Sequence, residues 1–441
     1  MIPRIVVAGT HSGAGKTTIA CGLIGALRAR GLTVQGFKVG PDYIDPSYHA
    51  LASGRPPRNL DAFLSRPELI APLAAHGAAG AGIAVIEGVM GMFDGASGRG
   101  ELASTAHVAK LLDAPVVLVV DAAAMARSAA AIVHGFASFD PDVALAGVIF
   151  NRVGSDGHEQ LLREAIEPLA LPVLGALRRD ATIVTPERHL GLVPAGEQRQ
   201  QARKALDALA EAMARYVDLD AVQRLARSAP PLTATPWSAG DPVAPRARIA
   251  IARGPAFSFH YEENLELLQA AGGHLCDFDP MADEALPHDC GALVLAGGFP
   301  EVYVAELEAN TPLRAEIAAF AAAGRPILAE CGGLLYLAQE LDGRPMCGVL
   351  PVTGRMAGRL TLGYREAVAA TPTPWLKLGE RVRGHEFHYS AVEPADTPAP
   401  AWEFAGRHEG LVHGSVQASY LHTHWAAHPE FAAGFVRAAA A

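Results

Sequence analysis

The chain has 441 residues, which is enough for two or three domains with separate cores. Half of its residues are hydrophobic, 19% are charged and the formal net charge is −10, which excludes a disordered chain and argues against a general nucleic-acid-binding surface. Five scattered cysteines without CxxC spacing argue against a disulfide framework or a structural zinc site. No apolar run approaches a membrane span and no signal-peptide core precedes Gly9, so we expect a cytoplasmic protein with no membrane partner.

The first predicted elements are short β-branched runs that alternate with alanine-rich amphipathic stretches. Five of these runs predict buried parallel strands, at residues 4–9, 33–40, 83–88, 115–121 and 145–153. Residues 17–30 and 122–136 predict crossover helices between them. This alternation predicts an α/β fold with a doubly wound parallel sheet, in which ligands bind at the carboxyl ends of the strands.

The stretch GTHSGAGKTT, residues 9–18, follows the first predicted strand and has the character of a phosphate-binding loop. Its glycines let backbone N–H groups turn inward on phosphate oxygens, Lys16 can reach the β- and γ-phosphates, and the Thr17 hydroxyl can ligate Mg²⁺. The strict pattern has glycine six residues before the lysine, where this chain has Thr10, and Gly9 lies one residue further back. A chance glycine-rich turn is the plain alternative. We expect ATP and Mg²⁺ here, with ATP contacts from Gly13, Gly15, Lys16, Thr17 and Thr18.

Two acidic stretches follow, each at the end of a predicted strand. Their carboxylates would face a bound nucleotide, where Mg²⁺ needs one or two of them: Asp42, Asp45, Glu87 and Asp94. Solvated turns and helix caps are the alternative for these acids. Lys38 could offset phosphate charge or be a surface lysine, and Asn151 could meet an adenine edge or form a turn.

Residues 228–247 are dense in Pro, Ser, Thr and Gly and predict a linker. Beyond it the alternation restarts, with strands predicted at residues 248–253, 292–298 and 326–331 and a helix from about Glu262. We therefore expect two doubly wound α/β domains, residues 1–227 and 248–441.

Cys331 stands at a predicted strand–turn–helix junction and is followed by Gly332 and Gly333. This is the pattern of a nucleophile elbow, in which the helix N-terminus favours the thiolate; a buried structural cysteine is the alternative. Amides at Gly297 and Gly298, with that of Gly332, could form an oxyanion hole or belong to a plain turn. A base is also needed, and His422 is the best placed. His424 is better explained by a structural or surface position, while His385 and His388 are less clear.

These motifs together carry a family likeness. GTHSGAGKTT, FKVGPDYIDPSYH, IEGVMGMFDG, LAGGFPEVY, AECGGLLYL, GHEFHYS and SYLHTHW occur in order and resemble the cobyrinic acid a,c-diamide synthase family nearly end to end. The N-terminal domain resembles dethiobiotin synthetase, whose loop has the same extra residue, which accounts for Thr10. The C-terminal domain resembles class I glutamine amidotransferases of the cobyric acid synthase subgroup, with a flavodoxin-like fold.

The resemblance implies an enzyme that amidates the a and c acetates of cobyrinic acid in cobalamin biosynthesis, with glutamine as nitrogen donor and ATP–Mg²⁺ as activator. It implies Cys331 as nucleophile and His422 as its base; in the mechanism built from these parts, the amides of Gly298 and Gly332 hold the oxyanion. It places the metal on Thr17, Asp42 and Glu87, and the activated carboxylate near Lys38, Asp45 and Asp94. Class I domains usually carry Glu two residues after the histidine, where this chain has His424.

Two further interpretations stay open. Hydrogenobyrinic acid or nickel-sirohydrochlorin would use the same machinery, and no motif describes the macrocycle-binding surface. A partitioning-type nucleotide-switch ATPase is the non-enzymatic alternative; it predicts a second lysine ahead of GKT, and residues 9–15 contain none. Small molecules (corrinoid, glutamine and ATP) are the expected partners, and a homodimer is left open.

Overall fold

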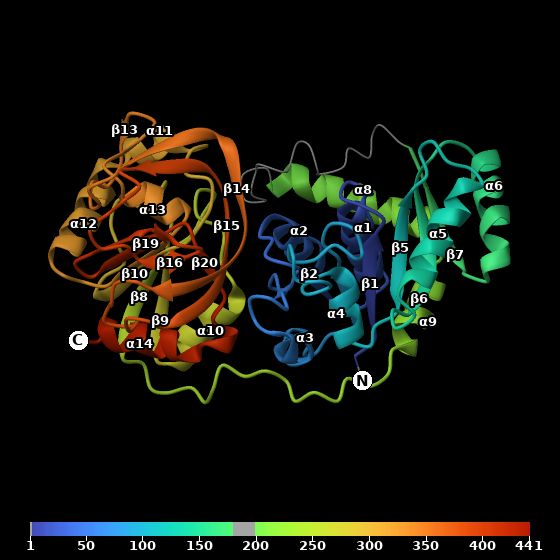
Figure 1. The fold of residues 1–441 in the computed structure, drawn as a ribbon, viewed down its shortest axis with the longest axis horizontal. Coiled ribbons are helices and arrows are strands. Elements are labelled where there is room, and N and C mark those ends of the chain that lie inside the picture. Colours follow the sequence, from blue (N-terminus) through green and yellow to red (C-terminus); the bar gives the residue numbers. More distant parts are fainter. Residues whose placement is uncertain (1, 180–198) are drawn as a thin grey trace. The chain divides into compact units, whose positions relative to one another are not determined.

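The computed structural model describes residues 2–179 and 199–441. The chain divides into two compact units, residues 1–237 and 238–441 (Figure 1). Each unit has its own buried core. Among the described helices, none combines the length and apolar character that crossing a membrane requires.

The first unit is built on a parallel sheet whose described strands follow the order β3-β2-β4-β1-β5-β6-β7. β1 and β4 lie near its centre and are buried along their whole length, as expected for strands covered by helices on both faces. Their carboxyl ends therefore meet at one edge of the sheet. The strands are β1 (Arg4–Gly9), β2 (Val34–Val39), β3 (Asn59–Leu60), β4 (Ile83–Glu87), β5 (Val116–Asp121), β6 (Leu145–Val153) and β7 (Val173–Arg178).

Helices connect and cover these strands. Apolar side chains of α1, α2, α8 and α9 share one buried cluster with the sheet. Elsewhere in the unit α4 contacts β1 and α5 packs beside α6. The helices are α1 (Lys16–Ala29), α2 (Ile44–Ser53), α3 (Ile70–Gly77), α4 (Thr105–Leu111), α5 (Ser128–Phe139), α6 (Asp156–Ile166), α8 (Arg199–Tyr216) and α9 (Leu219–Ser228).

The second unit has a parallel sheet in the order β19-β11-β10-β8-β9, extended by the antiparallel edge strand β18. Numbered within the unit this is the order 5-4-3-1-2, the flavodoxin-like arrangement, with its switch point between β8 and β10. The strands are β8 (Ala247–Ala252), β9 (Gly273–Phe278), β10 (Cys290–Leu295), β11 (Ile327–Glu330), β18 (Leu411–His413) and β19 (Val416–Ser419). The helices are α10 (Glu262–Ala270), α11 (Val304–Ala309), α12 (Thr311–Ala322), α13 (Gly332–Leu337) and α14 (Pro429–Ala439).

A second, largely antiparallel sheet in this unit is dominated by a long hairpin of β14 (Thr353–Ala369) and β15 (Arg381–Glu393). Its order is β13-β12-β14-β15-β20; off this path, β16 pairs with β14, and β17 pairs with β16. The shorter strands are β12 (Glu340–Leu341), β13 (Arg344–Pro345), β16 (Trp402–Phe404), β17 (Arg407–Glu409) and β20 (His422–Thr423). The hairpin places His385 on β15 opposite His422 on β20.

The predicted fold class is confirmed: both units contain parallel sheets with crossover helices. In the parallel sheets β3, β7, β9 and the edge strand β18 were not predicted, and neither was the second sheet with its β14–β15 hairpin. The helix predicted at residues 122–136 begins later, because α5 runs from Ser128 to Phe139.

Candidate active sites

The predicted phosphate-binding loop joins β1 to α1. Gly13 and Gly15 have positive φ angles of 80° and 99°, and Gly15 caps α1 without a side-chain hydrogen bond. The first amides of α1 are therefore free of a side-chain cap and can bind an anion. The Lys16 side chain folds back over Gly9, where an added Cβ would lie 2.8 Å from Lys16 Cγ, and Lys16 Nζ donates to the His11 carbonyl at 3.2 Å.

Two other predicted nucleotide contacts lie beside this loop. Thr18 is buried in the first turn of α1, and its hydroxyl has no hydrogen-bond partner among the described residues. Asn151 lies two residues before the end of β6. Its side-chain NH₂ donates to the Ala14 carbonyl at 3.0 Å, and its side-chain oxygen accepts from the Arg152 amide. Both polar ends of the Asn151 amide are thus engaged within the protein, and its contact with adenine stays a prediction.

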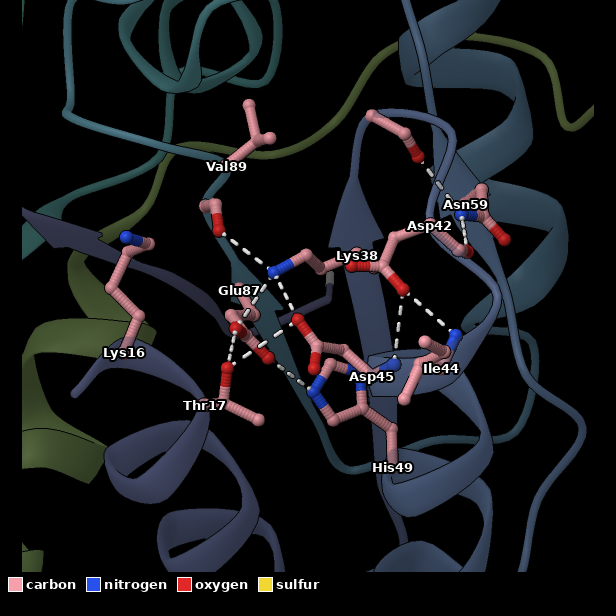
Figure 2. A network of polar contacts seen from close by, with 12 residues as sticks. Lys16, Thr17, Lys38, Asp42, Ile44, Asp45, His49, Asn59, Glu87 and Val89 are labelled. Atoms are coloured by element: carbon pink, nitrogen blue, oxygen red, sulfur yellow. Dashed lines mark hydrogen bonds and ion pairs between the residues drawn. The ribbon is translucent and has the colours of Figure 1, made fainter. Parts of the chain in front are cut away.

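A buried charge cluster fills the sheet edge next to the loop (Figure 2). Thr17 Oγ1 donates to Glu87 Oε1 at 2.6 Å and lies 3.4 Å from Asp45 Oδ2. Lys38 Nζ lies between the two carboxylates, 2.6 Å from Asp45 Oδ2 and 2.7 Å from Glu87 Oε1. His49 Nε2 contacts the other Glu87 oxygen at 2.7 Å. Strands β2 and β4 and helices α1 and α2 each contribute to this cluster, which brings predicted site residues together.

The electrostatics of the cluster leave one carboxylate less well compensated. Burial alone would disfavour the charged forms of Lys38 and Glu87. The charges of Asp45 and Glu87 outweigh it and raise the pKa of Lys38, while Lys38 and His49 lower the pKa of Glu87. Burial, with the nearby charges of Asp42 and Glu87, raises the pKa of Asp45 well above its usual range. Two carboxylates, Glu87 fully buried and Asp45 partly buried, beside one lysine favour an additional cation.

Asp42 and Asp94 occupy different positions from this cluster. Asp42 Oδ1 accepts from the amides of Ile44 and Asp45 at 2.8 and 3.1 Å, so it caps the start of α2. Asp94 is exposed, and its Oδ2 accepts from the Gly91 amide at 2.9 Å within a turn. Their predicted roles at the metal and at the activated carboxylate therefore stay predictions, and Asp45 is the aspartate that contacts Thr17.

Among the described residues, no group of three or more His, Cys, Asp and Glu side chains is arranged to hold a metal ion. In the charge cluster two carboxylates are joined instead by the Thr17 hydroxyl. Such a set suits Mg²⁺ beside a nucleotide, because this ion takes one or two carboxylates and completes its shell with phosphate oxygens and water.

The second site centres on Cys331, between β11 and α13. Its φ of 48° lies in the left-handed region, which a non-glycine residue adopts only when its surroundings enforce it. The Cys331 amide donates to the Ser419 carbonyl at 2.7 Å, and a Cβ on Gly333 would lie 2.2 Å from the Leu295 carbonyl oxygen. The sharp turn and the close packing behind it match the predicted nucleophile elbow.

The predicted oxyanion hole lies beside this turn. A Cβ added to Gly332 would lie 3.1 Å from the Gly298 nitrogen, so the two segments are in contact. Burial, together with the charges of Glu301 and Glu330, raises the pKa of the Cys331 thiol, although the Gly332 amide opposes this. The resting side chain is therefore a buried, protonated thiol that needs a base to become a nucleophile.

His422 is buried on β20 and borders the loop that follows β10. A Cβ on Gly297 would lie 2.4 Å from His422 Cε1, and His422 Nδ1 lies 3.7 Å from Oε2 of Glu330, the residue before Cys331. The His385 ring stacks on the His422 ring with centroids 4.9 Å apart and planes 15° apart. The structure thus places His422 at the carboxyl edge that carries Cys331.

The remaining histidines take other positions. His424 accepts from the Ala426 amide at 3.3 Å through Nδ1, and its Nε2 lies 3.5 Å from Glu263 Oε2. It is buried and has structural contacts. His388 stacks on Tyr420 with ring centroids 3.7 Å apart.

Two residues at these sites were not singled out from the sequence. His49 follows Asp45 by four residues on α2, so one helix face presents both; this spacing was the available signal. Glu330 is the last residue of β11, immediately before Cys331, and no local sequence pattern indicated a role for it.

Comparison with known proteins covers both units. Residues 5–193 match the CobQ/CobB/MinD/ParA nucleotide binding domain, and residues 248–430 match the CobB/CobQ-like glutamine amidotransferase domain. The chain is 54% identical to hydrogenobyrinate a,c-diamide synthase of Streptomyces coelicolor, over 99% of this chain and 97% of the relative. It is 52% identical to the enzyme of the same name from Mycobacterium bovis, over 100% and 98%. It is 46% identical to cobyrinate a,c-diamide synthase of Syntrophotalea carbinolica, over 98% of each chain.

Proposed function

This chain belongs to the a,c-diamide synthase family, and from that premise we propose how its residues divide one reaction between two sites. It is an ATP- and glutamine-dependent carbon–nitrogen ligase that converts the a and c acetate carboxylates of a corrinoid into amides, in cobalamin biosynthesis. The family likeness predicted from the motifs is confirmed, and so is the type of reaction.

We propose hydrogenobyrinate, the metal-free macrocycle, as the preferred substrate. The sequence motifs favour cobyrinate, with hydrogenobyrinate as the alternative. Relatives at 51–54% identity carry the hydrogenobyrinate name, whereas those named for cobyrinate are 43–46% identical. This difference supports the alternative macrocycle within the same reaction.

In the second unit, Cys331 is the proposed nucleophile and His422 its base. His422 takes the thiol proton while the sulfur bonds to the glutamine amide carbon, and backbone amides of Gly298 and Gly332 hold the oxyanion. The carbon–nitrogen bond then breaks, the proton passes to the leaving nitrogen as ammonia departs, and water hydrolyses the glutamyl thioester to glutamate. The elbow conformation of Cys331 is the single observation that most supports this assignment.

In the first unit, the loop amides and Lys16 bind the ATP phosphates and orient the γ-phosphate. A substrate carboxylate oxygen attacks the γ-phosphorus and ADP leaves, which gives an acyl phosphate. Ammonia then bonds to the acyl carbon, the bond from that carbon to the phosphate oxygen breaks, and inorganic phosphate leaves with one proton from the nitrogen. A carboxylate is a poor electrophile without this activation, which is why ATP is consumed.

We place the metal on Thr17, Glu87 and Asp45. Asp45 takes the place of the predicted ligand Asp42, because the Thr17 hydroxyl lies beside the carboxylates of Glu87 and Asp45. Bound Mg²⁺ would offset charge on the transferring phosphoryl group. Lys38, held between the same two carboxylates, is positioned to offset charge at this edge as well. His49 fixes the second oxygen of Glu87 and so holds this carboxylate in one orientation.

The test is an assay of purified protein with ATP, Mg²⁺, glutamine and each macrocycle in turn, with amide groups counted by mass spectrometry. We expect two amides on hydrogenobyrinate and a lower kcat/KM for cobyrinate. A higher kcat/KM for cobyrinate would reverse the substrate assignment. Cys331→Ala should lose amidation from glutamine but keep it with added ammonium, and loss with both nitrogen donors would contradict two separate sites.

A further inference from the structure

Class I domains usually carry a glutamate two residues after the catalytic histidine, and this chain has His424 at that position. The residue two positions later, His424, is turned to other partners: its Nδ1 accepts from Ala426 and its Nε2 faces Glu263. Its ring also packs on Tyr261, with centroids 4.7 Å apart. His424 therefore acts in local structure, and the group that orients His422 lies elsewhere.

Glu330 meets the requirements for that role. Its Oε2 lies 3.7 Å from His422 Nδ1, and the two side chains are 14% and 1% exposed. Its other oxygen, Oε1, accepts from the Thr423 amide at 3.2 Å and from the Thr423 hydroxyl at 2.7 Å. Because Thr423 follows His422 on β20, these two hydrogen bonds hold the carboxylate beside the imidazole.

The other side of the imidazole is closed by an uncharged group. His385 on β15 stacks on His422, and its Nε2 is bonded to the Tyr261 hydroxyl at 3.0 Å. Burial, together with the charge of His422, lowers the pKa of His385 well below its usual range, so this ring stays neutral. Phe259 and Gly297 also border His422 and carry no side-chain charge. Glu330 and His385 are thus the titratable groups that the described contacts place against the ring.

We propose that Glu330 is the positioning carboxylate of the glutaminase site, in place of the acid that usually follows the histidine. This inference rests on the proposed roles of Cys331 and His422. The acid comes from the nucleophile strand itself, one residue before Cys331, and it reaches the histidine across β11 and β20.

The carboxylate acts through the imidazole in two ways. It holds the proton of His422 on Nδ1, which leaves the Nε2 lone pair to accept the thiol proton. It also stabilises the imidazolium that forms when Cys331 loses its proton. The gain must exceed an opposing effect, because the same carboxylate disfavours the thiolate. The proton passes from Cys331 to His422 and then to the leaving ammonia, so Glu330 itself neither gains nor loses a proton.

The test compares Glu330→Gln, Glu330→Asp and the control Glu403→Gln, which alters an exposed glutamate of β16. Glutamine hydrolysis is measured from pH 5 to pH 9, together with ammonium-dependent amidation and thermal unfolding. Glu330→Gln keeps the size of the side chain and an oxygen that can accept from Thr423, so a folded variant is expected. Wild type and Cys331→Ala are measured first, to establish that Cys331 carries the hydrolysis.

We expect Glu330→Gln to lower kcat/KM for glutamine by about ten- to a hundredfold, within the range that one lost charge-assisted contact produces. The acid limb of its pH profile should move to lower pH, because no carboxylate then stabilises the protonated ring. Glu330→Asp retains the charge, so it should keep the wild-type limb and recover part of the rate. Glu403→Gln should match wild type, and ammonium-dependent amidation should be unchanged in all three.

An unchanged rate in Glu330→Gln would overturn the inference while the proposed function stands. A loss of rate without movement of the acid limb would also overturn it, because a purely structural role has that signature. Wild-type protein without glutamine hydrolysis, or hydrolysis that survives Cys331→Ala, would overturn the proposed function and this inference with it.

Discussion

At the scale of single residues, the charge cluster beside the phosphate-binding loop consists of a small number of charges that compensate one another. Glu87 is fully buried and contacts Thr17, Lys38 and His49. Its burial is tolerated because these partners supply hydrogen bonds and positive charge. The carboxylate thus joins the phosphate-binding helix to β2 and α2 as well as serving the proposed chemistry.

We expect Glu87→Gln to abolish ammonium-dependent amidation and to leave glutamine hydrolysis by the second unit intact. The free energy of unfolding of the first unit should fall by about 3 kcal/mol, because Lys38 and His49 lose a buried counter-charge. Lys38 keeps its contact with Asp45. The two half-reactions and urea unfolding check this expectation. The exposed Glu68→Gln serves as the matched control. Amidation at the wild-type rate in Glu87→Gln would show that the cluster is structural.

The sequence allowed prediction of residues that stand in motifs, but less of how they share contacts. Lys16, Thr17 and Cys331 lie at strand–helix turns where the motif itself fixes the backbone. Asp42 and Asp45 are three residues apart, and only the start of α2 decides which carboxylate turns toward Thr17. The contact of Glu330 with His422 joins strands 92 positions apart in the chain, beyond the reach of any local pattern.

At the scale of elements, the phosphate-binding loop offers a matched pair of glycines. Gly13 and Gly15 both have positive φ, but a Cβ on Gly13 meets nothing within 4 Å, whereas one on Gly15 would lie 2.1 Å from Asn151 Nδ2. Gly13→Ala should therefore cost only the backbone strain of about 1 kcal/mol. Gly15→Ala should cost more, because the loop or Asn151 must also shift.

We expect Gly15→Ala to raise KM for ATP by tenfold or more and Gly13→Ala to raise it by less. Steady-state kinetics with ammonium as nitrogen donor measures both. Equal effects of the two substitutions would indicate that backbone strain alone matters and that Asn151 does not support the loop.

The corner between β17 and β19 makes stability dependent on pH. Burial raises the pKa of Glu409 to about 7, although the Ser419 hydroxyl and the Tyr420 amide donate to its carboxylate. The folded state therefore binds this proton more tightly than the unfolded chain. Its contribution to stability is complete below about pH 4.5 and is lost as pH rises toward 7. The difference corresponds to about 3 kcal/mol at most.

Glu409→Gln should remove this pH dependence. At pH 5 we expect little difference from wild type, whereas at pH 8 the variant should be the more stable protein by up to about 3 kcal/mol. Urea unfolding of the second unit at both pH values measures the effect. If the free energy of unfolding changed equally between pH 5 and pH 8 in both proteins, ionisation of Glu409 would not reduce the stability of the folded state.

The elements that sequence patterns missed have a common physical cause. β14 mixes polar and apolar residues, contains Gly358 and Gly363, and shifts register between Met356 and Thr361. Its hydrophobic alternation is accordingly weak, and no tight turn marks the hairpin. β3 has only two residues, too few for any period to be detected. The longer buried strands β1, β4 and β5 were predicted, because each contains a continuous β-branched or apolar run.

At the scale of the whole molecule, each unit has a separate core and the connecting chain makes contacts with both. The Arg4 guanidinium donates to the Pro230 carbonyl, and the Trp237 amide donates to the Pro72 carbonyl, so residues 230–237 follow the first unit. The Val243 amide donates to the Ala270 carbonyl in the second unit. The segment predicted as a linker from its composition thus changes units over a few residues after Trp237.

Separate cores predict separate responses to ligands. We expect ATP with Mg²⁺ to bind the folded first unit alone, and at a hundred times its Kd to stabilise that unit by about 2.7 kcal/mol. Differential scanning calorimetry should show two unfolding transitions, one of which rises by about 5–10 °C with the nucleotide while the other stays in place. Lys16→Ala should keep both transitions and lose the shift, because its ammonium no longer reaches the phosphates. A nucleotide that moved both transitions together would show that the two cores unfold as one cooperative unit, and the reaction centres would then share their stability as well as their product.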